Sequence, residues 1–117
     1  METGCCSALY PNSSLAPITW PPLIFAPAIQ IVINHTGLPA DRSTEGLAGW
    51  RRGLETVAGQ DNVALKISGL GRPGQRWSLE ANGPVIRDAI AIFGADNCMF
   101  ASNYPVDRLA GSFETIF

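Results

Sequence analysis

Three residues whose side chains could do chemistry lie one or two positions past the ends of short apolar runs: His35, Ser68 and Asn103. An imidazole can bind a metal or act as a general acid or base near neutral pH. A hydroxyl and a carboxamide can each donate and accept hydrogen bonds, and so can orient a substrate or a water molecule. Polar groups that follow successive apolar segments in this way indicate a site at the ends of strands.

The elements that must position these residues are strands predicted at 29–33, 63–67 and 98–101. Their starts are about 35 residues apart and a helix-length segment fills each gap, which is typical of successive βα units. Such units bring the carboxyl ends of parallel strands to one edge, where α/β proteins bind ligands. We therefore expect one common site that contains His35, Lys66 or Ser68, and Asn103 with Asp107.

Boundary signals predict the helices that connect the strands. Ser43 or Thr44 can cap a first helix, and Gly59 would end it. A second helix is expected to start around Pro84, a residue favoured in the first turn, and to end at Gly94. The segment from Ser78 to Asn82 could add a turn before it. The first helix would bury a stripe of residues at three-and-four spacing, namely Leu47, Trp50, Leu54 and Val57.

Composition limits the class of protein. With 117 residues, 46% of them hydrophobic, and a formal charge of −2, the chain is one domain or less and lacks the basic surface of a nucleic-acid binder. Its three cysteines, Cys5, Cys6 and Cys98, form no CxxC pair, so reduced thiols in the cytoplasm are expected rather than disulfides or a thiolate zinc site. Prolines interrupt each apolar stretch that could span a membrane, and we expect no membrane partner.

The chain divides into two segments of different character. Residues 1–28 contain Pro, Ser and Cys without helical or strand periodicity, and this atypical segment either packs on the sheet or does not belong to the natural fold. Residues 29–117 are orderly. Three parallel strands leave open edges, whereas a closed barrel needs eight strands and about 250 residues. The predicted fold is therefore α/β, a partial (β/α)8 TIM barrel that comprises roughly the last three strands with their helices.

Residues 30–117 resemble the amidohydrolase-related (amidohydrolase 2) family of metal-dependent TIM-barrel hydrolases, including its lactonase-like branch. The resemblance depends on several motifs in order and at matching spacing. They are Ile31-Val32-Ile33-Asn34-His35-Thr36-Gly37-Leu38-Pro39, Trp50-Arg51, Asn62-Val63-Ala64-Leu65-Lys66-Ile67-Ser68-Gly69-Leu70, Trp77, Phe93-Gly94 and Met99-Phe100-Ala101-Ser102-Asn103-Tyr104-Pro105-Val106-Asp107.

The resemblance implies that His35 is an active-site residue, which binds a divalent, zinc-like metal in some branches and contacts substrate in the lactonase-like one. The alternative is a histidine that only makes hydrogen bonds at the barrel rim. The family's first-strand His-x-His motif has no counterpart here, so we expect this chain alone to bind no metal. Asn103 stands where many relatives have a catalytic Asp, and an amide cannot take a proton from water. Asn103 would then orient a water or a substrate carbonyl, or serve as a turn residue.

Other candidate residues also have two interpretations. Lys66 shares a strand face with Ser68 and points either into the barrel, beside a substrate, or outward to water. Arg72 and Arg76 follow the same strand and could clamp a substrate carboxylate, or could simply be solvated. Asp107 could supply a substitute carboxylate, but a cap for a third helix starting there is favoured.

Two functions from different classes follow. The first is a hydrolase that uses water to cleave a C–O or C–N bond of a small cyclic or carboxylated metabolite, with this chain inactive alone. The second is a non-catalytic remnant or interaction module that self-associates through its open sheet edges.

Overall fold

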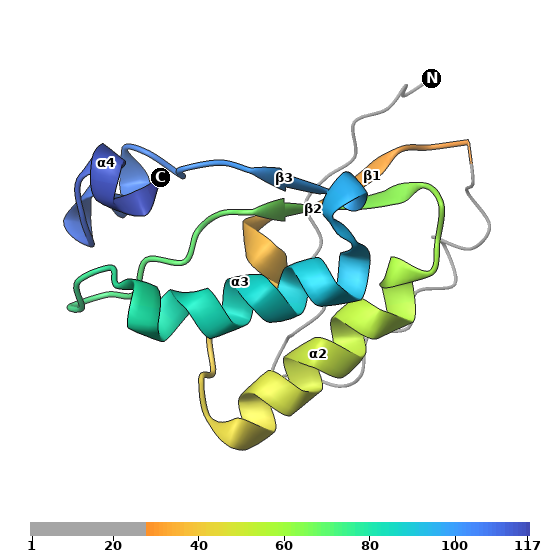
Figure 1. Ribbon diagram of the computed structural model, residues 1–117, viewed down its shortest axis with the longest axis horizontal. Coiled ribbons are helices and arrows are strands. Elements are labelled where there is room, and N and C mark those ends of the chain that lie inside the picture. The colour runs from red at the N-terminus through yellow and green to blue at the C-terminus, as the bar shows by residue number, and fades with distance from the viewer. Residues whose placement is uncertain (1–27) are drawn as a thin grey trace.

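The computed structural model describes residues 28–117, so the atypical segment predicted at 1–28 lies outside the described residues except for its last position. Figure 1 shows a sheet with two long helices beneath it. In chain order, with η for a 3-10 helix, the elements are β1 (Ile31–Ile33), η1 (His35–Gly37), α2 (Thr44–Ala58), β2 (Val63–Ile67), α3 (Leu79–Phe93), η2 (Ala95–Asn97), β3 (Cys98–Phe100), η3 (Val106–Leu109) and α4 (Phe113–Ile116).

The three strands form one parallel sheet in the order β1-β2-β3, which confirms the predicted topology. Leu65 at the centre of β2 is in register with Ile33 of β1 and Cys98 of β3. Because neighbouring parallel strands share a direction, their carboxyl ends and the loops that follow lie at one edge of the sheet (Figure 1).

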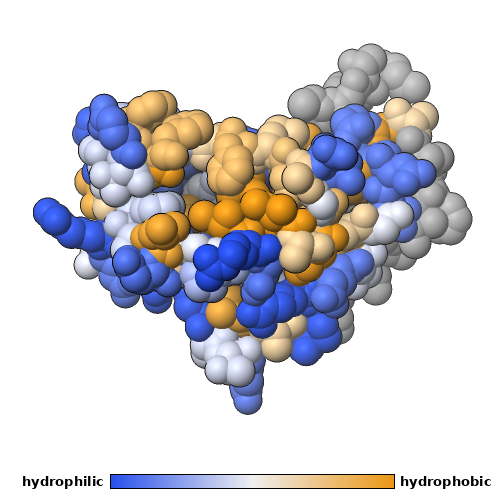
Figure 2. Space-filling view, viewed as in Figure 1, coloured by the Kyte–Doolittle hydropathy of each residue, from blue (hydrophilic) through white to orange (hydrophobic). Residues whose placement is uncertain are grey.

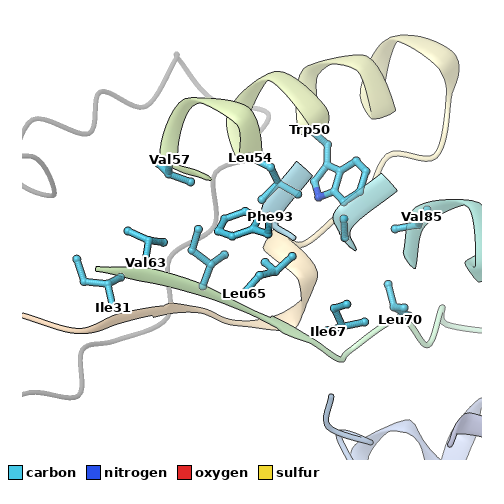
Figure 3. Packing of buried hydrophobic residues seen from close by; sticks show 12 residues of the cluster. Ile31, Trp50, Leu54, Val57, Val63, Leu65, Ile67, Leu70, Val85 and Phe93 are labelled. Carbon is cyan, nitrogen blue, oxygen red and sulfur yellow. The ribbon is translucent and has the colours of Figure 1, made fainter. Parts of the chain in front are cut away.

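Helices α2 and α3 pack on the same face of the sheet, and the core lies between these layers (Figure 3). The alternation of strand side chains turns Val63, Leu65 and Ile67 toward the helices, and all three are buried. Lys66, one position out of phase, therefore lies on the opposite face together with its register partner Met99. In the barrel predicted from the sequence, that opposite face is the interior.

Helix α2 begins where the sequence predicted. Ser43 is its N-cap, and the hydroxyl oxygen accepts a hydrogen bond from the backbone N–H of Gly46 at 3.0 Å. Trp50, Leu54 and Val57 are buried against the sheet, and burying each such side chain contributes about 1.5–3 kcal/mol.

Helix α3 begins at Leu79, five residues before the start predicted around Pro84, so the preceding turn expected at 78–82 belongs to the same continuous helix. Ser78 is the N-cap and accepts from the backbone N–H of Ala81 at 3.2 Å. Pro84 consequently lies inside the helix, where it cannot donate a bond to the carbonyl four residues earlier. The cap and the burial of Val85, Ala89 and Phe93 against the sheet outweigh this local cost. Gly94, with φ of 82°, ends the helix as predicted.

The predicted third helix from Asp107 is instead two short helices, η3 and α4, and Asp107 is not a cap. Asp107 lies within η3, and α4 has its own N-cap, Ser112, which accepts from the backbone N–H of Thr115. Gly111, a poor helix former, separates the two. Within residues 28–117, no helix has the length and apolar character needed to cross a bilayer.

Candidate active site at the carboxyl edge of the sheet

The loops after β1 and β2 bring His35 and Ser68 together, as the sequence predicted. The imidazole Nδ1 of His35 lies 3.2 Å from the hydroxyl oxygen of Ser68, within hydrogen-bond distance. Ser68 is buried and His35 is partly exposed, so the imidazole lies at the boundary between the protein and solvent. This pair is the centre of the candidate site.

Thr36 joins the same two loops. Its hydroxyl donates to the carbonyl of Ser68 at 2.9 Å and accepts from the backbone N–H of Ser68 at 3.0 Å. Its own carbonyl accepts from the indole N–H of Trp50 at 2.8 Å, which connects the loop to helix α2. Thr36 is fully buried and has a φ of 56°, a conformation that costs a β-branched residue about 1–3 kcal/mol. These three hydrogen bonds hold the strained turn in place.

Gly69 allows the His35 ring to approach the second loop. Its φ is +65°, and a Cβ atom built there would lie 2.6 Å from Nδ1 of His35. Any side chain at this position would therefore have to displace the imidazole.

Partial burial lowers the pKa of His35 below 6.5, and the nearby positive charge of Lys66 lowers it further, whereas the carboxylate of Asp107 opposes both. The imidazole is consequently neutral at pH 7 and can accept a proton. The influence of Lys66 on His35 also favours the inward interpretation of this lysine, since Lys66 lies on the face of the sheet away from the helices.

Asp107 is a buried carboxylate at the same edge. One oxygen accepts from the backbone N–H of Gly71 at 3.2 Å, and the other accepts from the side-chain amide of Asn103 at 3.0 Å. Its influence on His35 places this carboxylate within electrostatic range of the imidazole. The cap interpretation was wrong because the decisive partner, Gly71, is 36 residues away in the chain.

Asn103 has the geometry of a turn residue. Its φ is 56°, its carbonyl accepts from the backbone N–H of Asp107 at 3.0 Å, and its amide nitrogen is engaged by the Asp107 carboxylate. These bonds favour the turn interpretation, and a catalytic role for Asn103 stays a prediction.

The two predicted arginines are separated. Arg72 lines a pocket of about 320 Å³ between the loops, whereas Arg76 is exposed and is not part of its wall. The second arginine of this pocket is Arg42, which the sequence analysis missed. The available signal was its place in the loop after the first polar motif, at the edge expected to bind ligands.

The described residues do not fit a complete metal centre. Residues 28–117 contain no group of three or more His, Cys, Asp or Glu side chains able to hold an ion. The buried side-chain oxygen of Asn34 has no hydrogen-bond partner in this part of the chain, but one imidazole and one amide oxygen fall short of the three protein ligands of a typical catalytic zinc site.

Comparison with known proteins agrees with this architecture. The amidohydrolase family profile matches residues 26–116. An uncharacterized protein of Sinorhizobium fredii is 46% identical over 91 residues, which cover 78% of this chain and 30% of that protein. An L-fucono-1,5-lactonase of Burkholderia ambifaria is 35% identical over 88 residues, covering 74% of this chain and 30% of the lactonase.

Among solved structures, an amidohydrolase from Burkholderia multivorans with bound zinc superposes with a TM-score of 0.69 and 29% identity, covering 80% of this chain and 36% of that one. The chain thus spans about a third of the length of the relatives it matches, and its three βα units correspond to part of their barrel.

Proposed function

The chain belongs to the amidohydrolase family, and we propose that it supplies part of the active site of a hydrolase that opens a lactone or a related cyclic ester by attack of water. The match to an L-fucono-1,5-lactonase supports the ester class of substrate. The observation that carries the proposal is the contact between His35 and Ser68 at the edge where parallel strands end.

The chemistry follows from the state of the imidazole. Because its pKa is lowered, His35 is neutral at pH 7 and accepts a proton from the attacking water as the new C–O bond forms. The protonated imidazole then gives this proton to the ring oxygen of the lactone as the bond between the carbonyl carbon and that oxygen breaks. The ammonium group of Lys66 stabilises the negative charge that develops on the carbonyl oxygen. Ser68 holds the imidazole in one orientation.

A chimera tests this proposal. Residues 26–117 replace the matching segment of the L-fucono-1,5-lactonase of Burkholderia ambifaria, and lactone opening is followed by the acid that it releases. We expect the chimera to be active and His35→Ala to reduce kcat at least a hundredfold, the usual contribution of a general base. Glu55→Gln, an exposed change on α2, is the matched control. A folded chimera whose activity survives His35→Ala would refute the assignment.

The 117-residue chain by itself is expected to be inactive, since its three βα units correspond to only part of the barrel of the relatives it matches. Lactone turnover by the purified chain that disappears in His35→Ala would contradict this expectation.

Self-association is the second candidate function, and the exposed apolar side chains near β3 favour it. Figure 2 shows hydrophobic residues along β3 and toward the C-terminal helices. Phe100 is 58% exposed and Leu109 91% exposed, and Met99, Tyr104 and Phe113 are also exposed. An open strand edge beside such a surface favours pairing with another chain. Size-exclusion chromatography with light scattering distinguishes a monomer from a self-associated species, and a monomer at micromolar concentration argues against association.

A further inference from the structure

The pocket between the first two strand loops is large enough for a small ligand. Its volume is about 320 Å³, at the lower end of the range for small-molecule sites. Its wall comprises residues 38–40 and Arg42 from the loop after β1, and Gly69, Gly71, Arg72, Pro73 and Gln75 from the loop after β2.

The wall that residues 28–117 form around this pocket is positively charged and includes no acidic side chain. Arg42 and Arg72 both contribute to it. Burial lowers the pKa of Arg42, and the like charge of Arg72 lowers it further, so the two guanidinium groups repel one another. The neighbouring carboxylate of Asp41 is directed elsewhere, since it accepts from the backbone N–H of Ser43 at the start of α2. Among residues 28–117, neither arginine has an ion pair.

Arg42 is held in a fixed position by neutral acceptors. Its Nε donates to the carbonyl of Pro39 at 2.6 Å, and its Nη1 donates to the carbonyl of Ala81 at 3.3 Å and to the side-chain oxygen of Asn82 at 3.2 Å. These acceptors are neutral, so they do not compensate the positive charge of Arg42. Of the five N–H donors of a guanidinium, the two on Nη2 have no acceptor within the described part of the chain.

The pocket adjoins the candidate active site. Gly69 contributes to its wall and also packs against the ring of His35. Gly71 contributes to the wall and packs against the carboxylate of Asp107, which a Cβ atom would approach to 2.9 Å. The pocket and the imidazole are therefore separated only by Gly69, which belongs to the pocket wall and packs against the ring of His35.

We propose that this pocket binds the carboxylate of the hydroxy acid that ester hydrolysis releases, with Arg42 and Arg72 as its anion-binding residues. The proposal builds on the proposed function, which generates a carboxylate at a carbon beside His35. A planar guanidinium with two available N–H donors suits a carboxylate, because the two groups can form a bidentate pair of parallel N–H···O hydrogen bonds. The partner of Arg72 in binding a carboxylate is therefore Arg42 rather than Arg76, which was predicted from the sequence.

The test is binding of L-fuconate to the purified 117-residue chain, followed by NMR of the arginine Nε–H groups. We expect saturable shifts that include Arg42, and at least a tenfold rise in Kd for Arg72→Gln, since hydrogen bonds to charged groups contribute about 1.5–3 kcal/mol. Arg76→Gln makes the same change of charge four residues further along but outside the pocket, and we expect it to leave Kd unchanged. Arg87→Gln, on the exposed side of α3, controls for net charge.

Two reference ligands define the chemistry. Neutral L-fucose has a similar size and should not bind, and inorganic phosphate should bind more weakly than L-fuconate. The pocket assignment is overturned if Arg76→Gln weakens binding as much as Arg72→Gln does, and equal affinity for phosphate overturns the carboxylate assignment. Because Arg42→Gln also removes bonds to α3, Arg42→Lys is the second variant, which should retain the fold and still weaken L-fuconate binding.

Failure of this proposal is distinguishable from failure of the proposed function. An active chimera without L-fuconate binding by the arginine pair removes only the pocket assignment. L-fuconate binding that depends on Arg72, together with a folded but inactive chimera, removes only the hydrolytic assignment.

Discussion

Gly69→Ala tests how closely the two loops of the site are packed. Gly69 has a φ of +65°, and an added Cβ would lie 2.6 Å from Nδ1 of His35 and 2.8 Å from its Cγ. The substitution therefore has two costs: a left-handed backbone for a residue with a Cβ, and displacement of the imidazole from Ser68.

The size of each cost can be worked out from matched glycines. A left-handed conformation costs an L-residue about 1–2 kcal/mol, and loss of the hydrogen bond between His35 and Ser68 about 1 kcal/mol more, so Gly69→Ala should reduce the free energy of unfolding by about 2–3 kcal/mol. Gly74 has a φ of +73°, and no non-neighbouring atom of residues 28–117 lies within 4 Å of its Cβ position, so Gly74→Ala isolates the backbone cost. Gly59, with φ of −77° and equally open space, should be neutral or stabilised by about 0.4–1 kcal/mol on substitution with Ala.

The assay is urea unfolding of the three variants, together with NMR of the imidazole nitrogens. The imidazole signals are unambiguous because His35 is the single histidine of the chain. We expect Gly69→Ala alone to shift the Nδ1 resonance. Equal losses of stability in Gly69→Ala and Gly74→Ala, with an unchanged imidazole spectrum, would refute the close contact between the loops.

Three further predictions concern the charge and the anchoring of the first loop. Lys66→Met should raise the pKa of His35, measured by NMR titration, because it removes a positive charge, whereas Arg52→Met on the exposed side of α2 should not. The free energy of unfolding should fall as pH drops from 6.5 to the folded-state pKa of His35 and then level off, because the unfolded chain binds more protons than the folded one in this pH range. Lys66→Met should narrow this pH range, since it raises the folded-state pKa. A free energy of unfolding that does not change with pH in this range would contradict the lowered pKa. Trp50→Phe should reduce the free energy of unfolding by about 2 kcal/mol or more, because the buried carbonyl of Thr36 loses its donor, and a smaller change in the urea midpoint would argue against that bond.

Local patterns were sufficient to predict the elements of this fold whose signals are local. The apolar run at Val63–Ile67 and the polar residue that follows it placed a strand and its functional end within one residue of the structure. Ser43 identified the start of α2, because a cap acts on an N–H only three residues away. The common site of His35 and Ser68 followed from the topology of parallel strands alone.

Features that depend on distant partners could not be predicted. Helix α3 has Ser78 as its N-cap, although Pro84 is favoured in a first turn. The helix extends past Pro84 because its residues Val85, Ala89 and Phe93 are buried against a sheet formed by other parts of the chain. Arg42 is oriented by Ala81 and Asn82, 39 and 40 residues away, and no spacing within its own loop indicates those contacts. Asp107 likewise accepts a hydrogen bond from the backbone N–H of Gly71, 36 residues away, and no local spacing indicates that contact.

The hydroxyl of Thr36 acts as a surrogate peptide group, because it both donates to and accepts from the backbone of Ser68 beyond the last paired residues of the strands. The hydrogen bonding between β1 and β2 thus continues past the ends of the strands through the side chain of Thr36. The first two strand loops are thereby coupled mechanically, and neither can swing open without breaking two buried bonds. A ligand that enters the cleft between them must accordingly match a preformed receptor, so selectivity by size and shape is built into the backbone before any charge is recognised.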